Sequence, residues 1–177
     1  MLCHKMTEYI ADIEHYEKVI ARVQGAKRLL WIATADLKDL YVRKGANDAI
    51  PFLSVLNDLV KRGVEVRLLH AKEPGTAFRN DFDKYPALWK GLQRRLCSRV
   101  HMKVVVIDSE LVYIGSANLT GAGMGMKSPL NRNFEAGILS DEDGFIDAAM
   151  VHINDIWEGK HCTKCGRKDL CLDCIVK

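Results

Sequence analysis

The first stretch of the chain carries apolar side chains at alternating four- and three-residue steps. They are Tyr9, Ile13, Tyr16, Ile20 and Val23. Because this spacing places side chains on one face of a helix, it predicts a helix over residues 7–24. Gly25 follows directly, and glycine is common just past the end of a helix.

A strand–helix–strand order comes next. Residues 28–34 (RLLWIAT) and 64–70 (VEVRLLH) are short, largely apolar runs that predict buried strands. Between them, Pro51 suits the first turn of a helix that we expect to end near Arg62, before Gly63. Since strands joined by a helix usually run parallel, the pattern indicates a parallel pair with a helical crossover.

The rest of the chain divides into shorter elements. Strands are predicted at 102–107, 111–114 and 134–139, a tight turn at 108–110 and a final helix at 141–157. Loops are predicted at 41–48, 71–80 and 119–133, and residues 81–96 are weakly helical. We therefore expect an α/β fold with a mixed, mostly central β-sheet flanked by helices on both faces. Residues 1–158 form this domain, and residues 159–177 form a separate Cys-rich tail.

Composition and charge narrow the class of protein only a little. The chain is 48% hydrophobic and 28% charged, which is ordinary for a globular protein. A net charge of +3 does not by itself indicate a nucleic-acid-binding protein. No apolar run approaches the length of a membrane-spanning helix, and residues 1–5 do not resemble the start of a signal peptide. The default expectation is a cytoplasmic protein with no membrane anchor.

The candidate chemistry lies around His101 and Lys103. Two residues apart on a strand, their side chains point to the same face, so a nucleophilic imidazole meets a fixed cation. A hairpin return brings Gly115, Ser116 and Asn118 back toward them. Glycine permits a close approach of the backbone to a ligand, and the two polar side chains add donors. Together these residues predict a seat for a phosphodiester.

The pattern His-x-Lys-x4-Asp, which ends at Asp108, and the following Gly-Ser-x-Asn resemble the HKD signature of the phospholipase D superfamily. Six specified positions at fixed spacing arise by chance in a chain of this length with odds on the order of one in a million. The signature occurs once. The resemblance therefore implies that a chain with a single copy, like the small bacterial endonucleases, forms a homodimer that pairs two signatures across a two-fold axis.

The resemblance implies a mechanism and assigns roles to residues. His101 attacks phosphorus and forms a phosphohistidine, while His101 of the partner subunit protonates the leaving oxygen. Lys103, Ser116 and Asn118 hold the phosphate oxygens, and no metal or other cofactor takes part in catalysis. Glu135 corresponds to an acid that holds the nucleophilic histidine. Asp108 belongs to the signature, but its place at a turn suggests that it orients backbone.

Basic residues precede the signature, and we include Arg95 among the substrate-binding residues. It stands in a group with Lys90, Arg94 and Arg99. These side chains could follow a phosphate backbone. A solvated helix face explains them equally well.

The tail contains two Cys-x-x-Cys pairs. They are Cys162, Cys165, Cys171 and Cys174. Four thiolates in two such pairs predict a tetrahedral zinc site of structural type. The five-residue gap between the pairs is short for a zinc ribbon, and an iron–sulfur cluster uses the same ligands. Paired disulfides are the weakest option in a cytosolic chain.

The residues and the resemblance together favour one function and leave two alternatives. The favoured function is a metal-independent nuclease, a homodimer that cleaves DNA or RNA. One alternative is a phospholipase D or cardiolipin-type lipid hydrolase, although no basic amphipathic helix with exposed aromatic residues is visible. The other is a non-catalytic nucleic-acid-binding module with the tail as a zinc knuckle.

Overall fold

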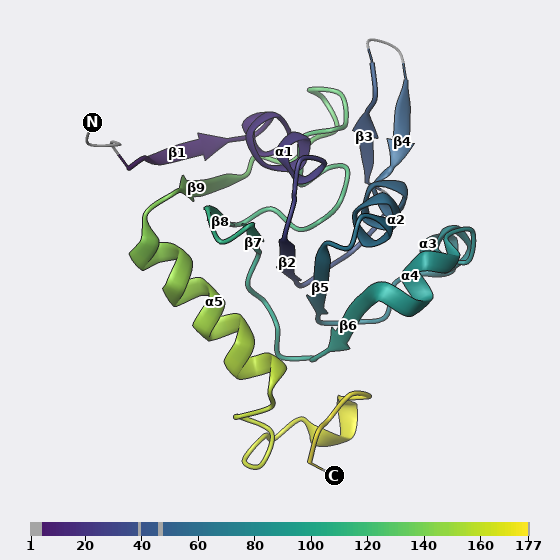
Figure 1. Ribbon diagram of the computed structural model, residues 1–177, viewed down its shortest axis with the longest axis vertical. Helices are drawn as coiled ribbons and strands as arrows, with labels where there is room; N and C mark the ends of the chain where they lie inside the picture. The colour runs from purple at the N-terminus through teal and green to yellow at the C-terminus, as the bar shows by residue number, and fades with distance from the viewer. Residues whose placement is uncertain (1–4, 39, 46–47, 177) are drawn as a thin grey trace.

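The computed structural model describes residues 5–38, 40–45 and 48–176 and contains a seven-stranded mixed sheet (Figure 1). The strand order is β1–β9–β8–β7–β2–β5–β6. The strands are β1 (Thr7–Ala11), β2 (Leu29–Thr34), β5 (Glu65–His70), β6 (Leu92–Leu96), β7 (Val104–Ile107), β8 (Leu111–Gly115) and β9 (Ala136–Ser140). The expectation about a signal peptide concerns residues that lie mostly outside the described part of the chain, as does Cys3.

The sheet has a parallel half and an antiparallel half. Strand β2 runs parallel to β5, and β5 runs parallel to β6. Helix α2 (Phe52–Lys61) joins β2 and β5 and packs against β5, which confirms the predicted crossover. On the other side of β2, the strands β7, β8, β9 and β1 pair antiparallel in turn.

Helices cover both faces of the sheet, as the alternation along β2 requires. Ile32 packs into the core that contains α2, η1 (His15–Ile20) and α1 (Ala21–Val23). Its neighbours Trp31 and Ala33 point to the opposite face, where α5 (Asp143–Trp157) buries Ile146 and Ile153. The chain is therefore a three-layer α/β fold with two apolar cores, one on each side of the sheet.

The predicted helix over residues 7–24 is wrong in its first part. Residues Thr7–Ala11 form the edge strand β1, in which Tyr9 pairs with Ile138 of β9. Ile10 is buried in the core while Tyr9 is exposed, which is the period of a strand. Helical structure begins at His15, with the π-helix η1. Pairing with a strand about 130 residues away in the sequence outweighs the local helical spacing.

Three further segments differ from the sequence expectation. Part of the predicted loop 41–48 belongs to a small hairpin of β3 (Tyr41–Arg43) and β4 (Ala49–Pro51), although residues 46 and 47 lie outside the described residues. The loop 71–80 runs into α3 (Thr76–Phe82). The weakly helical stretch 81–96 contains α4 (Pro86–Gly91) and then the edge strand β6. In each case the elements are short, and tertiary pairing decides them.

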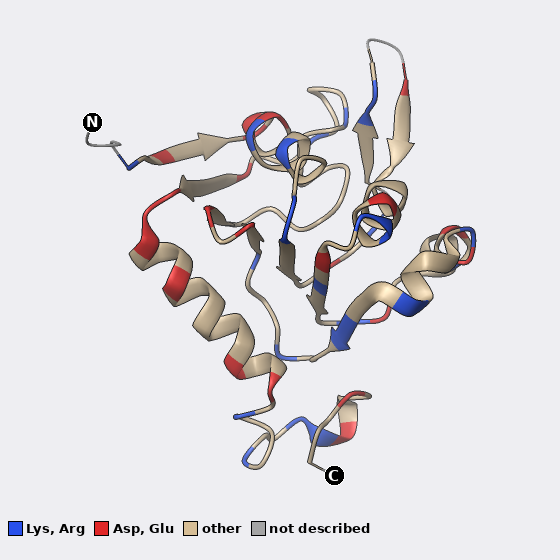
Figure 2. Cartoon of the chain, in the orientation of Figure 1, with Lys and Arg blue, Asp and Glu red and all other residues tan. Residues whose placement is uncertain are grey.

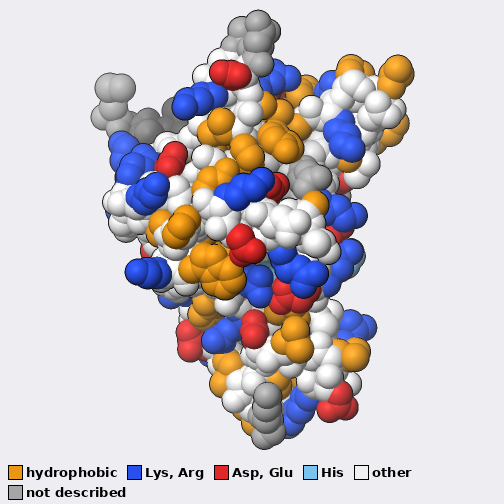
Figure 3. Space-filling model, turned by 90° about the vertical axis from the view of Figure 1, so that its right-hand side faces the viewer, with side chains coloured by type: hydrophobic (Ala, Val, Ile, Leu, Met, Phe, Trp, Pro, Cys, Tyr) orange, Lys and Arg blue, Asp and Glu red, His pale blue; other side chains and the backbone are white. Residues whose placement is uncertain are grey.

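Beyond α5 the tail has little regular structure. It contains one 3-10 turn, η2 (Lys168–Leu170), and none of residues 159–176 is buried. Figures 1 and 3 show the tail as a separate lobe at one end of the molecule. Among the described residues, no helix combines the length and the apolar character needed to cross a bilayer.

Candidate active site

Four chain segments meet at one edge of the sheet. Ala33 of β2 pairs with Val104 of β7, so the end of β2 lies beside Lys103. The amide of Gly115, at the end of β8, donates to the Lys103 carbonyl oxygen at 3.1 Å. Ser116 donates its amide to the Ala136 carbonyl oxygen at 2.9 Å, which brings the start of β9 to the same edge. The predicted site residues before β7 and after β8 are thus neighbours.

His101 and Lys103 form the centre of this edge. His101 is exposed, whereas Lys103 is buried. The Lys103 ammonium donates to the His101 carbonyl oxygen at 2.6 Å and lies 3.4 Å from Nδ1 of the His101 ring. Burial lowers the pKa of Lys103 from its ordinary value, and the charge of Glu135 opposes this effect. The accessible imidazole of His101 therefore lies beside the ammonium group of a buried lysine.

Asn118 is oriented by residues that the sequence analysis did not identify. The amide of Asp36, just after β2, donates to Oδ1 of Asn118 at 3.1 Å. The hydroxyl of Thr34 accepts the amide of Leu119 at 3.2 Å and fixes the backbone beside it. With Oδ1 engaged, the side-chain NH2 of Asn118 is the group that remains to donate to a ligand. The sequence signal for this support was the polar end of an otherwise apolar strand.

Ser116 and Glu135 contact each other. The Ser116 hydroxyl donates to Oε2 of Glu135, and it accepts the amide of Ala136 at 3.1 Å. The other carboxylate oxygen of Glu135 accepts from the side chain of Asn133 at 2.9 Å. Within the described residues, no hydrogen bond joins Glu135 to His101, which differs from the role that the resemblance implied. Glu135 instead positions Ser116 and supplies a negative charge near Lys103.

Gly115 has a structural reason to be glycine, in addition to the close approach that it allows to a ligand. A β-carbon on Gly115 would collide with the hydroxyl of Tyr113 and lie 2.7 Å from the Ala136 carbonyl oxygen. The Tyr113 side chain is fully buried, and its oxygen accepts the amide of Ala117 at 3.2 Å. The Tyr113 ring thus supports the floor of the site from the core side. This contact supplies a reason for the glycine that the sequence analysis did not include.

Asp108 lies at the other end of β7, away from His101. Its carboxylate accepts the backbone amides of Lys27, Arg28 and Leu29 at distances between 2.7 and 3.1 Å. Burial raises its pKa, but these hydrogen bonds outweigh burial and lower the pKa below its ordinary value. Asp108 thus fixes the start of β2 against the β7–β8 turn, which agrees with the expectation that it orients backbone.

A family model described as cardiolipin synthase, PLD-like domain, matches residues 19–157. This match covers most of the chain and includes every residue of the signature. The chain belongs to the phospholipase D-like family.

Solved structures and curated relatives agree with this assignment. NucT from Helicobacter pylori superimposes with a TM-score of 0.66 at 17% identity, covering 88% of this chain and 97% of NucT. Nuc from Salmonella typhimurium, a phospholipase D family member, gives 0.62 at 19% identity, covering 88% and 95%. A cardiolipin synthase from Clostridium perfringens is 24% identical over an alignment of 115 residues, and the match covers 59% of this chain and 23% of the synthase. The chain thus spans about a quarter of that relative's length.

Two cavities flank the signature of this PLD-like domain. The first, of about 620 Å³, is lined by Asn118 together with Lys38, Tyr41, Lys127 and Asn133 among others. The second, of about 380 Å³, is lined by His101 and Met102 and by residues of the tail. The PLD-like site therefore sits between two hollows rather than at the end of one.

Two of the basic residues before the signature, Arg95 and Arg99, contact the C-terminal part of the chain, whereas Arg94 pairs with Glu73. Arg95 donates to the backbone carbonyl oxygen of Trp157 and lies over the Trp157 ring at 5.1 Å. Arg99 lies 3.8 Å from Sγ of Cys165. Figure 2 shows these basic positions along β6 and the connection to β7. Arg95 joins β6 to the end of α5 in the structure, and its role in substrate binding stays a prediction.

All four cysteines of the tail line the 380 Å³ cavity on the His101 side. In the described part of the chain, no three His, Cys, Asp or Glu side chains are grouped closely enough to hold a metal ion. The described cysteines form no disulfide either. The zinc site predicted from the Cys-x-x-Cys pairs therefore remains a prediction.

Proposed function

We propose that this PLD-like domain is a metal-independent nuclease that acts as a homodimer and forms a phosphohistidine on His101. The observation that carries the proposal is the exposed His101 imidazole beside the buried Lys103 ammonium, with the Asn118 amide at the same sheet edge. If His101 and Lys103 were only a solvated pair on a surface strand, nothing would offset the free energy that burial of the Lys103 charge costs. A site that must neutralise a phosphate justifies that cost.

The reaction takes two displacements at phosphorus. In the first, a ring nitrogen of His101 forms a bond to phosphorus and the bond to the leaving oxygen breaks. His101 of the partner subunit donates the proton that this oxygen needs. In the second, that same imidazole takes a proton from water, the water oxygen bonds to phosphorus, and the phosphorus–nitrogen bond breaks. Lys103 and Asn118 donate to the non-bridging oxygens, where negative charge is concentrated.

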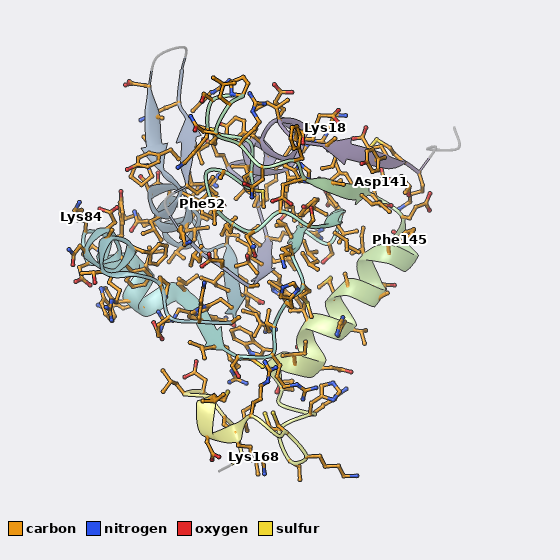
Figure 4. The ribbon with its side chains drawn as sticks, turned by 180° about the vertical axis from the view of Figure 1, so that it is seen from behind. Lys18, Phe52, Lys84, Asp141, Phe145 and Lys168 are labelled. Carbon is orange, nitrogen blue, oxygen red and sulfur yellow. The ribbon has the colours of Figure 1, made fainter. Side chains whose placement is uncertain are left out.

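An apolar surface beside the site supports the need for a second copy. Cross-strand partners share a face of a sheet, and Val104, Ile114, Ile138 and Tyr9 are partners in succession. Val104 is covered by α5, but Tyr9 is 71% exposed, and Ile114 and Ile138 are also exposed. Exposed Phe145, labelled in Figure 4, extends this surface along the first turns of α5. Ile114 directly precedes Gly115, so a partner that covers this row would lie next to the site.

The cavity beside Asn118 suits a nucleic acid strand. Lys127 supplies an ammonium group for phosphates, and Tyr41 offers a ring, 43% exposed, on which a base can stack. Lys38 lies in the same cavity but pairs with the Asp36 carboxylate at 3.1 Å, which a phosphate would have to displace. The similarity to NucT and Nuc extends over nearly their whole chains, which supports a nuclease more strongly than a relative matched over a quarter of its length. TrmBL2, an archaeal chromatin protein whose structure shows a mode of DNA binding, has the same fold at a TM-score of 0.59 and 15% identity.

A lipid substrate is the second candidate, and one observation favours it. Leu130 and Phe134 are each 95% exposed in the loop that leads to Glu135. Apolar side chains at the edge of a site can enter a lipid surface, and the matching family model describes a cardiolipin synthase domain. The nuclease remains the primary proposal because the same two side chains can be covered by the partner subunit.

A substrate panel in the presence of EDTA tests the function. Plasmid, single-stranded DNA, RNA and cardiolipin vesicles are incubated with the protein, and products are resolved by electrophoresis or chromatography. We expect cleavage of at least one nucleic acid and none of cardiolipin. With an oligonucleotide labelled at the phosphate that becomes bound, an acid-labile and alkali-stable adduct should form on His101. His152→Ala, which removes another exposed histidine, should leave the adduct unchanged. An adduct-free cleavage reaction would contradict the mechanism.

Subunit mixing tests the shared site. When equal amounts of wild-type and His101→Ala chains exchange freely, only wild-type homodimers retain two histidines. Activity should then fall to about a quarter of that of the same total amount of wild type, because a site built on a two-fold axis needs both copies. A fall to about a half would indicate independent sites within each chain.

A further inference from the structure

The tail has no core of its own. None of residues 159–176 is buried, and its larger apolar side chains, Leu170 and Leu172, are exposed. A segment of this length buries too little apolar surface to offset the entropy of ordering its backbone. Some other interaction must therefore hold the tail in a defined position.

Hydrogen bonds join the tail to one short segment of the catalytic domain. The carboxylate of Asp173 accepts the amide of Leu96 at 2.7 Å, and the thiol of Cys171 lies 3.4 Å from the Leu96 carbonyl oxygen. Arg167 donates to the Ser98 carbonyl oxygen at 3.2 Å. These partners lie at the end of β6 and in the connection that continues to His101. The tail thus contacts the segment from which the nucleophile projects.

The cysteines and the nucleophile share one cavity. His101 and the four thiols of the tail all line the same space of about 380 Å³. Figure 1 shows why this is possible: the tail turns back beneath β6 and the β6–β7 connection after leaving α5. The tail therefore forms part of the wall that a substrate meets on the His101 side.

We propose that Cys162, Cys165, Cys171 and Cys174 bind one Zn²⁺ ion, and that this ion holds the tail as a fixed wall of the cavity that opens onto His101. Binding releases the thiol protons and gives a closed site of four thiolates with no open position, so the metal is structural. The effect on turnover rests on the proposed nuclease function, whereas the metal site does not.

The four thiols must converge to bind the ion, since the described residues hold no ready group of three ligands. No core packing opposes that movement, because the tail side chains are exposed or half-buried, but the contact of Cys171 with the Leu96 carbonyl oxygen must be given up. The two Cys-x-x-Cys pairs line one cavity, so a single ion in that space can be reached by all four sulfurs once they converge.

Metal content tests the site directly. The full-length protein is purified without chelator, and zinc and iron are measured by mass spectrometry. We expect about one zinc per chain, because four thiolates complete a tetrahedral site. Cys165→Ser and Cys174→Ser should lose the zinc, and Cys174→His should retain part of it. Cys97→Ser is the matched control, since Cys97 lines the same cavity outside the two pairs, and it should keep full zinc. Wild type without zinc, or with iron and visible absorption, would overturn the proposal.

Cys97 also reports on the wall itself. Cys97 is half-buried beside the tail. A variant with all four tail cysteines changed to serine should expose it, so that its alkylation, followed by peptide mapping, speeds up at least about tenfold, as expected for local opening. An unchanged rate in a variant that has lost its zinc would refute the wall. Circular dichroism of the same variant shows whether the α/β domain remains folded.

Activity then separates the two proposals. If the protein is a nuclease and the wall is real, zinc-free variants should show an increased KM for long substrates with a smaller change in kcat. If the wild type binds zinc but has no nuclease activity, the metal site is supported and the proposed nuclease function is wrong. If it has nuclease activity but binds no zinc, the proposed function is supported and the metal site is wrong.

Discussion

The sheet edge around His101 and the C-terminal tail lie on opposite sides of one cavity but are built differently. The edge is an extension of a packed sheet, with Lys103 and Tyr113 buried and Gly115 in the strand ladder. The tail contributes no buried residue and is attached through a few polar contacts at residues 96–99. The side chains proposed to react are thus fixed by the core, whereas the tail is held by these few polar contacts.

This difference means that the residues proposed to react and the residues that hold them in place can be changed independently. Substitutions at exposed His101 should change the reaction without changing stability, and substitutions at the supporting residue Tyr113 should lower stability. Substitutions in the tail should change neither the core nor the reacting groups, only the access to them.

The largest expected effect follows His101→Ala. Removal of the nucleophile should lower kcat/KM about ten-thousandfold. Catalytic residues act as a unit, and the loss of one of them removes nearly as much activity as the loss of all. The melting temperature should stay within a degree or two of wild type, because the His101 side chain is exposed. Turnover of a defined oligonucleotide and thermal unfolding measure the two effects. Residual activity above one part in a hundred would assign the nucleophile elsewhere.

Lys103→Met separates the charge from the packing. The methionine fills most of the buried space, so stability should be kept or raised, because a buried ammonium no longer has to be desolvated. The rate should fall by about a hundred- to a thousandfold, the usual loss for one group that stabilises transition-state charge. Lys61→Met is the control, at an exposed lysine of α2. A stable variant with undiminished kcat would remove Lys103 from the reaction.

Asp108→Ala acts on stability. It leaves three backbone amides at residues 27–29 without their acceptor, which should lower the free energy of unfolding by about 2–4 kcal/mol. Denaturant unfolding measures the loss. Glu110→Ala, which removes only an exposed ion pair with Arg28, should cost under about 0.5 kcal/mol. Equal losses in the two variants would mean that the Asp108 contacts contribute little.

The pKa of Asp108 adds a pH dependence to this prediction. Since the folded protein holds this pKa below its ordinary value, the carboxylate stabilises the fold fully above the pKa of the unfolded chain. That stabilisation is lost as the pH falls through the lower pKa of the folded state. Between about pH 6 and pH 3, wild type should therefore lose more stability than Asp108→Ala does.

The smallest effect concerns the alkaline limb of activity. Burial lowers the pKa of Lys103 from its ordinary value of 10.5, and the proposed mechanism needs the ammonium form. As the pH rises, kcat/KM should therefore begin to fall below pH 10.5, and Lys103→Arg should move the fall to higher pH, because a guanidinium stays charged. Lys61→Arg, at an exposed lysine of α2, should leave the limb in place. A limb that does not move in Lys103→Arg belongs to another group.

The sequence predicted which residues meet at the sheet edge around His101, because local spacing determines that arrangement, while their catalytic role stays a prediction. His101 and Lys103 precede a strand whose hairpin return must bring Gly115 and its followers alongside, whatever the rest of the chain does. Asp108 at the turn could likewise be assigned to the backbone. The strand–helix–strand unit was predictable for the same reason, since each element is long and clearly patterned.

The structural features that the sequence did not predict depend on contacts between segments that are distant in the chain. The strand β1 has helical spacing, and only its pairing with β9 makes it a strand. The support of Asn118 by the amide of Asp36 joins positions 82 residues apart. Glu135 was expected to hold His101, yet its oxygens are taken by Ser116 and Asn133. A single sequence carries no signal for such pairings beyond the presence of polar residues.

Gly159 determines where the tail can go. Its φ is +70°, a conformation that other residues rarely adopt, and a β-carbon there would lie 2.6 Å from Ile175 and 3.2 Å from the sulfur of Cys162. The reversal of the chain after α5 thus rests on one backbone hinge without a side chain. A bulkier residue at that position would adopt a strained backbone conformation and would have to displace the side chains of Ile175 and Cys162, so the path of the tail toward the β6–β7 connection depends on the absence of a side chain there.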